Sequence, residues 1–473
     1  MAETMSHTHR SGAVAPPDPR RWWALVLLCL AQFMVILDIT VVNVALPAIG
    51  AGLGLERAAL TWVVTAYTLC FGGLLMLGGR LADLLGRRRM FLAGLTLFTA
   101  ASLAAGLAGD ATTLLAARAG QGVGAALLSP AALSILTTSF HGGERHRALG
   151  VWAALGGSGA AAGVLVGGLL TSGPGWQWVF YVNVPIGVLV AALVPVAIAA
   201  GHRRPGRLDV PGALLVTAAS AALIYALVRA GESGWLPALG IAILLYAVFV
   251  VVQRRVPAPL VPPGLLARRP MATGVVAMLT ASALLISGFF LCSLLLQHLL
   301  GLSPLRTGLV FLPVAAATVA GAHLAGRLIT RTGRRPVAAG AFGLAALGFA
   351  LLAQAGTGAG AWTGVLPGFA LAAAGLGAGF VIATTTALAG VDGHHAGTAS
   401  GAVNTAHELG AAVGVAAVSA IAGASVGSGT AAAGGFTHAF WACAVAAAVV
   451  AVGLPILLPG GRPAPTDGPV FAH

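Results

Sequence analysis

Three ionisable side chains lie inside long apolar runs of this sequence, where charged groups are rare. Asp38 lies in LDITVVNVALP (37–47), Arg118 opens RAGQGVGAALLSP (118–130), and Glu408 lies in NTAHELGAAVG (404–414). A charge held away from water costs several kcal/mol unless it is paired or neutralised, so such residues usually have a function. Two acids that can gain and lose protons, with an arginine that stays charged, suit the coupling of proton movement to a change of shape.

The position of Asp38 favours a role in proton transfer. It lies about 12 residues inside its apolar run, which is roughly 18 Å at the rise of an α-helix and near the middle of a membrane. Desolvation there favours the neutral acid, which would lose its proton when its surroundings become wetter. The alternative is a structural acid that caps a neighbouring helix. Glu408 reaches a similar depth and is a candidate for a second proton site or a cationic-substrate site, unless it only hydrogen-bonds to His407.

Arg118 is the one basic residue that we place deep inside an apolar run. Because arginine stays charged, it needs an acidic or carbonyl partner there. Competition for an acidic partner would couple protonation to conformational change, and static packing is the alternative. Gln121 follows Arg118 by about one helical turn and is placed to share the same network.

A second polar motif, GGRLADLLGRRR (78–89), separates two apolar runs. It contains Gly79 and Gly86, and its Asp83 and Arg87 are four residues apart. An ion pair or helix-end contact that forms in only one conformation would act here as a latch. The alternative is that the arginines only fix the orientation of the chain in a membrane.

Further polar and aromatic side chains in the apolar runs are candidates for a substrate cavity. They are Asn43, Trp62, Tyr67, Gln121, Phe380, Asn404 and His407. Aromatic rings there could stack on a substrate, although packing or a position at the membrane interface is the better explanation for most of them. The four cysteines, all in apolar runs, have no paired spacing and are interpreted as packing residues. We expect no metal and no cofactor.

The composition indicates a polytopic membrane protein. The 473 residues are 58% hydrophobic and only 8% charged, far more apolar than a soluble domain. Apolar windows of about 20 residues, the length that crosses roughly 30 Å of hydrocarbon, recur along the chain. About fourteen are found, over 22–48, 58–80, 89–109, 111–138, 147–171, 175–199, 209–230, 234–253, 271–299, 304–327, 335–355, 361–388, 396–423 and 435–459. They predict an all-α fold of about fourteen transmembrane helices.

The arginines predict how the chain lies in the membrane. The net charge of +13 comes from arginine, since the sequence contains no lysine. We let successive spans cross the membrane in alternating directions, beginning from a cytoplasmic N-terminus. Every arginine then falls on the cytoplasmic side except Arg57, Arg118, Arg229 and Arg306. This pattern favours a multi-pass protein of the inner or plasma membrane with both termini in the cytoplasm, and it argues against nucleic-acid binding. The first apolar run is too long for a cleaved signal peptide.

An internal repeat divides the chain into two halves. Gly79, Arg80 and Leu81, followed by Gly86 and Arg87, recur 247 residues later as GRL (326–328) and GR (333–334). Such a repeat is typical of transporters built from duplicated bundles, with the substrate path between them. We expect a cytoplasmic tail (1–21), a six-helix bundle (22–199), two inserted spans with a Pro/Arg-rich connector (200–270), a second six-helix bundle (271–459) and a cytoplasmic tail (460–473).

Several motifs resemble those of a known family. GGRLADLLGRRR is similar to the cytoplasmic loop motif of the major facilitator superfamily, and RAGQGVGAALLSP is similar to its fourth-span motif. LDITVVNVALP, WQWVFYVNVPIG (176–187) and QHLLGLSPLRTGLVFLP (297–313) resemble the branch of fourteen-span drug:proton antiporters. The resemblance runs from about Trp22 to about Leu458. It implies the major facilitator fold and multidrug efflux driven by protons.

The fifth span departs from the family's antiporter signature at one position. Glycines match it at 150, 159, 163, 167 and 168, but Val164 occupies the place of the expected proline. Gly159, Gly163 and Gly167 lie on one helix face with Gly168 beside them, where small residues let another helix approach closely. Without the proline the helix keeps one more backbone hydrogen bond, which predicts a straighter helix than the signature implies.

The source of energy follows from motifs that are missing. The sequence has no GxxxxGK[ST] loop, no HExxH and no CxxC, so we expect a transporter rather than an ATPase or another enzyme. The leading interpretation is a secondary transporter that exports hydrophobic, and in some cases cationic, compounds in exchange for protons. Alternatives are a dedicated exporter of a self-made metabolite, a membrane sensor or a passive facilitator. The expected partners are a small hydrophobic substrate, protons and the lipid bilayer, with the monomer as the functional unit.

Overall fold

The computed structural model describes residues 21–140, 142–198, 209–230, 234–257, 259–260, 262–355, 360–389, 391, 396–423 and 430–458. The regular secondary structure of these residues is helical throughout, and a helix occupies each of the fourteen expected spans. Thirteen of the described helices are long and apolar enough to cross a membrane, and α5 (Gly142–Ser172) occupies the remaining span. The all-α prediction is therefore confirmed.

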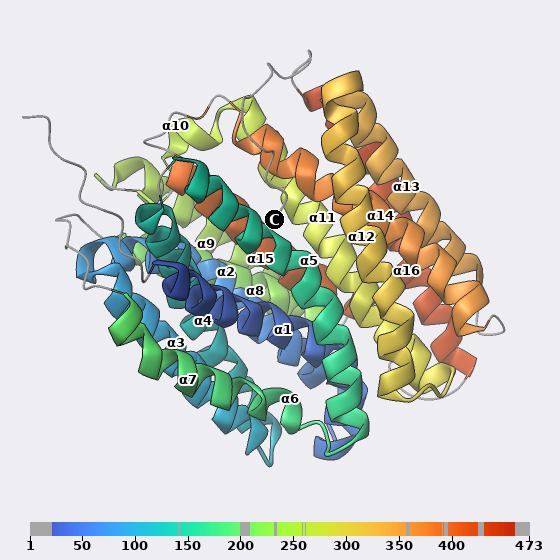
Figure 1. The fold of residues 1–473 in the computed structure, drawn as a ribbon. Helices are drawn as coiled ribbons and strands as arrows, with labels where there is room; N and C mark the ends of the chain where they lie inside the picture. Colours follow the sequence, from blue (N-terminus) through green and yellow to red (C-terminus); the bar gives the residue numbers. More distant parts are fainter. Residues whose placement is uncertain are drawn as a thin grey trace, which may run out of the picture.

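The first half comprises seven helices in chain order (Figure 1). They are α1 (Arg21–Leu53), α2 (Arg57–Leu85), α3 (Arg87–Gly106), α4 (Ala111–Ser139), α5, the single turn α6 (Trp178–Tyr181) and α7 (Asn183–Ala197). Here α6 and α7 together form the sixth expected span. Asp110 begins α4 because its carboxylate accepts a hydrogen bond from the backbone N–H of Thr113 at 2.9 Å, which satisfies a donor of the first turn.

The inserted helices and the second half follow. α8 (Val210–Val228) and α9 (Trp235–Arg255) form a hairpin, and the short α10 (Pro263–Leu266) leads into the second half. This half contains α11 (Arg269–Leu294) with a short π-helix η1 (Leu295–Leu299), α12 (Pro304–Thr332), α13 (Arg334–Ala355), the short π-helix η2 (Ala361–Val365), α14 (Leu366–Ala387), α15 (Ala396–Ala422) and α16 (Thr430–Leu457). α8 packs against α2 and α15, so the hairpin covers a seam between the halves.

The two halves repeat the same packing. α2 packs on α4 and α3 on α4 in the first half, as α12 packs on α14 and α13 on α14 in the second. Gly86 joins α2 to α3 with φ +102°, and Gly333 joins α12 to α13 with φ +90°, backbone angles that only glycine adopts without strain. Arg88 then donates a hydrogen bond to the carbonyl of Ile198, and Arg335 donates one to the carbonyl of Leu458. Each arginine thus binds the C-terminal end of the last helix of its own half.

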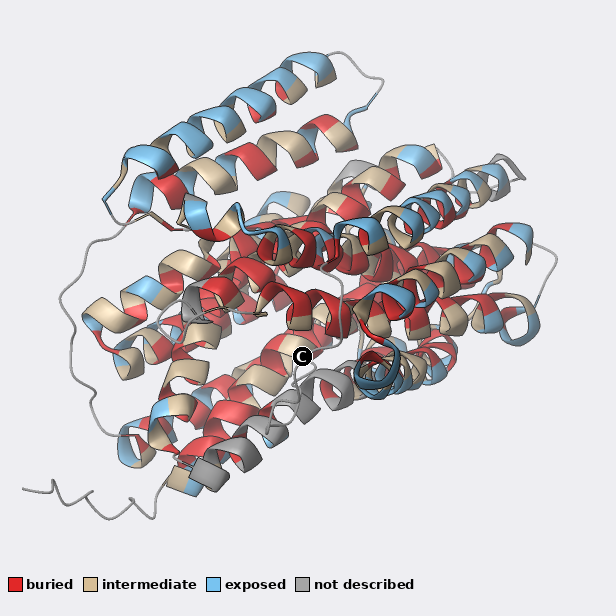
Figure 2. Ribbon diagram, turned by 90° about the horizontal axis from the view of Figure 1, so that it is seen from above, coloured by how far each residue is buried: buried red, intermediate tan, exposed pale blue. Residues whose placement is uncertain are grey.

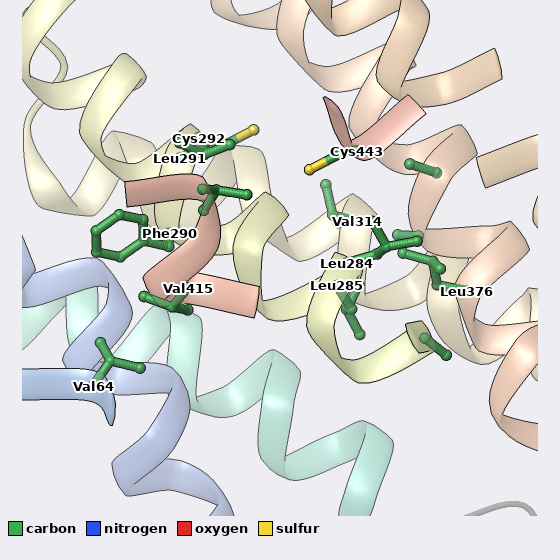
Figure 3. Close-up of a cluster of buried hydrophobic side chains, with 14 of the residues drawn as sticks. Val64, Leu284, Leu285, Phe290, Leu291, Cys292, Val314, Leu376, Val415 and Cys443 are labelled. Atoms are coloured by element: carbon green, nitrogen blue, oxygen red, sulfur yellow. The ribbon is translucent and has the colours of Figure 1, made fainter. Parts of the chain in front are cut away.

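Buried apolar residues lie in the middle of the molecule, and exposed residues lie mainly on its outer faces (Figure 2). One cluster combines residues 37–49 of α1 and 60–64 of α2 with most of the core of the second half. It includes Val64 of α2 together with Val415 of α15, and the free cysteines Cys292 and Cys443 pack in it as small side chains (Figure 3). A separate cluster contains residues 24–35 of α1 and 67–82 of α2 and draws on the first half alone.

These clusters show where the two halves meet. We call the end of the molecule with Arg21, Arg87, Arg88, Arg334 and Arg335 the arginine-rich end, and the end with the α1–α2 and α11–α12 turns the opposite end. The core is continuous between the halves toward the opposite end. α5 and α12 also approach each other there and diverge toward the arginine-rich end (Figure 1). The halves therefore meet most closely at the opposite end.

Candidate functional site

Asp38 of α1 and Arg118 of α4 form a buried ion pair. Nη1 of Arg118 lies 2.5 Å from Oδ2 of Asp38, and the residues are only 1% and 0% exposed. Arg118 also donates from Nε to the carbonyl of Val63 at 2.9 Å and from Nη1 to Oε1 of Gln121 at 2.8 Å. Its guanidinium carbon lies 4.5 Å from the ring centroid of Tyr67, a distance suited to a cation–π contact. The charge of Arg118 is thus balanced inside the protein.

The second oxygen of Asp38 accepts two more hydrogen bonds. Oδ1 accepts from Nε2 of Gln121 at 2.8 Å and from Nδ2 of Asn183 at 2.9 Å. Gln121 Nε2 also donates to the hydroxyl of Ser102 at 2.8 Å. Arg118, Gln121 and Asn183 thus each donate a hydrogen bond to the carboxylate group of Asp38. The sequence indicated that Asp38 is buried, but it did not reveal which side chains donate to it.

Asn183 and Ser102 were missed by the sequence analysis. Asn183 is fully buried at the start of α7, and Ser102 is fully buried on α3. Asn183 carried a detectable signal, because it is a polar residue within the motif WQWVFYVNVPIG at the start of an apolar span. Ser102 carried little, since serine is common in membrane helices and often bonds to its own helix, as Ser102 does with the carbonyl of Phe98.

Two residues expected to line a substrate cavity belong to this ion-pair network. Tyr67 and Gln121 have no exposed surface, and the ring of Tyr67 is covered by Arg118. In this conformation they position charges instead of presenting a surface to a substrate. Trp62 lies elsewhere and packs with the α2, α8 and α15 cluster around Leu69 and Ile224.

Glu408 lies in the other half, on α15, against α2. Its Cβ occupies the space beside Gly72, where a side chain on α2 would collide with it. Its recorded partner is His407, whose Nε2 is 4.0 Å from Oε1, beyond hydrogen-bonding distance. The ring of His407 lies 5.4 Å from that of Phe380, and Asn404 is partly buried one turn earlier. Glu408 and His407 of α15 therefore lie close together, and Phe380 of α14 lies beside the ring of His407.

The candidate latch residues lie at the arginine-rich end within the first half. Nη2 of Arg87 is 3.6 Å from Oδ1 of Asp83, and both side chains are partly exposed. Nη1 of Arg87 donates to the hydroxyl of Thr138 at 3.0 Å and to the carbonyl of Ser134 at 3.4 Å, which ties the loop to the end of α4. Gly79 of α2 lies close to Pro130, which is also on α4. These contacts join α2 and α3 to α4 within the first half, and a contact that forms in only one conformation and acts as a latch stays a prediction.

The glycines of α5 face two different partners. A Cβ atom on Gly159 would lie 2.9 Å from Ile36, and one on Gly167 would lie 3.0 Å from Val41, so both glycines face α1. Gly163 faces Thr40 of α1 in the same way. Gly168 faces the other half.

A Cβ on Gly168 would lie 2.8 Å from Cα of Leu305 on α12. The carbonyl of Val164 similarly faces Gly308 of α12. α5 thus uses small residues to pack both within its half and across the boundary.

Comparisons with known proteins agree on one family. The family model described as Major Facilitator Superfamily matches residues 28–415. The chain is 44% identical to a puromycin resistance protein of Streptomyces alboniger over 85% of this chain and 82% of that protein. It is 41% identical to a cephamycin export protein of Amycolatopsis lactamdurans over 82% of each. The fold matches a bacterial homologue of the human lysosomal transporter Spinster with a TM-score of 0.67 at 19% identity, covering 93% and 98% of the two chains.

Proposed function

The chain belongs to the major facilitator superfamily, and from this premise we propose that it exports small hydrophobic compounds in exchange for protons. The Asp38–Arg118 ion pair is the observation that carries the proposal. A proton added to Asp38 would remove the negative charge that Arg118 binds, so protonation and pairing compete for the same oxygen atoms. Arg118 would then be left inside the bundle without its counter-ion, which favours a rearrangement of α1 against α4.

The orientation of the chain is part of the same proposal. The arginine-rich end lies in the cytoplasm, in accordance with the excess of arginine in cytoplasmic loops. Because the halves meet most closely at the opposite end, the conformation described here is then the inward-facing one. Export requires a second conformation in which the halves separate at the opposite end and close at the arginine-rich end.

The substrate range is proposed from the relatives. Several relatives are named for a single antibiotic, among them puromycin, cephamycin and tetracenomycin C, whereas one relative is named as a multidrug resistance protein. The single-antibiotic names favour an exporter of one antibiotic-like metabolite or a small group of them, which was an alternative in the sequence analysis. Glu408 supplies a buried acid on the second half that would attract a substrate carrying a positive charge.

The experiment that tests the proposal measures flux in proteoliposomes. Purified protein is reconstituted, a pH difference is imposed, and uptake of puromycin, and then of a panel of hydrophobic antibiotics, is followed. We expect accumulation against the concentration gradient that disappears when an ionophore removes the pH difference. Equal flux with and without the pH difference would identify a passive facilitator. No flux for any compound would favour a sensor.

The latch gives a second expected result. Asp83→Asn and Arg87→Ala each break the same partly exposed ion pair, so both should shift the balance of inward- and outward-facing states in the same direction. Because exposed pairs contribute at most about 1 kcal/mol, the shift should be up to about fivefold. Reactivity of cysteines introduced at either end measures it. Arg89→Ala, which removes an exposed arginine of the same loop, is the control. Unchanged reactivity in both variants would exclude a latch.

A further inference from the structure

Side chains of the second half bind the main chain of α1 at the opposite end. The hydroxyl of Ser293, on α11, donates to the carbonyl of Asn43 at 2.6 Å. Nε2 of Gln297 donates to the carbonyl of Val44 at 2.8 Å and to the hydroxyl of Ser293 at 3.2 Å. Ser293 and Asn43 are buried in the region where the core runs from one half to the other. We call these four residues the α1–α11 contact.

The acceptor of this contact is available because of Pro47. Inside a helix, the carbonyl of residue 43 normally accepts a hydrogen bond from the N–H of residue 47. Proline has no N–H, and Pro47 lies inside the continuous helix α1. The carbonyl of Asn43 therefore lacks its usual partner in α1, and Ser293 of the other half supplies one.

The donors are positioned by the short π-helix η1, which follows directly on α11. Ser293 lies in the last turn of α11, and Gln297 lies in η1, four residues later. The wider turn ends where the N–H of Leu300 bonds to the carbonyl of Leu295. Both side chains consequently reach the same stretch of α1 while Gln297 also supports the hydroxyl of Ser293.

We propose that the α1–α11 contact is the polar gate of the opposite end, with Pro47 creating its acceptor and Ser293 and Gln297 closing it. This inference rests on the alternating access proposed above. In the outward-facing state α1 and α11 separate, and water that enters the opening takes the place of Ser293 on the free carbonyl. The gate can therefore open without leaving a backbone group unsatisfied in a dry interior.

The gate is carried by the same helix as the proton site. Asn43 follows Asp38 by five residues, or about 7.5 Å along α1. A displacement of α1 that follows protonation of Asp38 would thus reach the carbonyl that Ser293 binds. Pro47, Ser293 and Gln297 are positioning residues, which set the ratio of the two conformations and leave the proton site itself intact.

The test uses a cysteine reporter at Ile49, which is fully buried in the joined core at the opposite end. In a variant with the four native cysteines replaced, Ile49→Cys is labelled with a membrane-impermeant maleimide, from each side of the membrane. Ser293→Ala should raise the labelling rate roughly fivefold, because one buried hydrogen bond contributes about 1 kcal/mol. Pro47→Ala should raise it also, since the new N–H takes the carbonyl of Asn43 back into α1.

A double-mutant cycle distinguishes this device from general loosening. Pro47→Ala and Ser293→Ala disrupt one bond, so their effects should be clearly less than additive when combined. Ser282→Ala is the matched control, because Ser282 is a buried serine on the same helix whose hydroxyl has no hydrogen-bond partner among the residues that the structure describes. It should leave labelling unchanged.

The outcomes separate this inference from the proposed function. Unchanged labelling in Ser293→Ala and in Gln297→Leu, or fully additive effects in the cycle, would overturn the gate. If the parent protein shows pH-driven flux in that case, proton-coupled export stands and only the gate fails. Raised labelling in a protein without pH-driven flux would support the gate and contradict the export mechanism. Thermal unfolding of each variant in detergent checks that it is folded.

Discussion

Asp38→Asn is expected to abolish accumulation of substrate against its gradient while downhill exchange persists. The asparagine side chain has nearly the same size but cannot bind and release a proton in the relevant pH range. It also removes the negative charge that Arg118 binds, so the competition between protonation and ion pairing is lost. The measurement is flux in proteoliposomes with and without an imposed pH difference. We expect at least a hundredfold loss of the pH-driven part, since proton coupling is the step removed.

The stability of this variant needs its own control. Arg118 would remain buried without a counter-ion, which typically costs about 3–5 kcal/mol. The double variant Asp38→Asn/Arg118→Gln removes both charges and should recover much of the lost thermal stability without recovering uphill transport. Recovery of transport in the double variant would show that the single variant failed through folding. If Asp38→Asn concentrates substrate as well as the parent does, Asp38 is structural and Glu408 becomes the better candidate for the proton site.

Gly163→Leu is expected to have the second large effect. A Cβ at this position would lie 2.9 Å from Cβ of Thr40 and 3.3 Å from the carbonyl of Leu37, so a leucine cannot fit between α5 and α1. The helices must separate only one turn from Asp38, which displaces the ion-pair network. Overpacking of this kind costs about 1–3 kcal/mol. Transport should fall at least tenfold, and thermal unfolding should occur at a lower temperature.

Gly343→Leu is the matched control for this substitution. Gly343 also lies within a helix, α13, but a Cβ there would meet no atom of the described part of the chain within 4 Å. The control should leave both flux and stability close to those of the parent. Full transport in Gly163→Leu would show that close approach of α1 and α5 is not required.

Val164→Pro restores the proline of the family signature and should be tolerated if a kink belongs at that point of α5.

The fold was largely predictable because hydrophobicity and charge act along the sequence. Each apolar window of sufficient length corresponds to a helix, and the repeated GR motifs correspond to the glycine turns at Gly86 and Gly333. The family could be recognised for the same reason, since its motifs are short and contiguous. The spans, the glycine turns and the family motifs can all be predicted without knowing which helices are in contact.

The candidate site was predictable only in part. Burial of Asp38 and the need of Arg118 for a partner follow from their positions in apolar runs. That they bind each other, and that Asn183 completes the network, depends on contacts between residues 80 and 145 positions apart. Such contacts follow from the rotation of each helix about its axis. An apolar run that is hydrophobic all round does not fix that rotation.

The same limit applies to α5. Gly163 and Gly168 were assigned to one packing motif, yet the first faces α1 and the second faces α12. Proline often breaks a helix, but α1 continues through Pro47. Its consequence lies on another helix, where Ser293 binds the carbonyl that the proline leaves without a partner. A local sequence pattern shows that a backbone acceptor is released but does not show which residue will use it.

Arg88 and Arg335 each bind the end of the last helix of their own half. These two contacts have a consequence for the order in which the halves assemble during translation. Arg88 finds its acceptor at Ile198, so the first half can close as soon as the ribosome has delivered that residue to the membrane. Arg335 must wait for Leu458, which directly follows α16, the last helix of the second half. The first bundle can therefore be finished while the second is still being translated, and it would offer the later helices a completed surface on which to assemble.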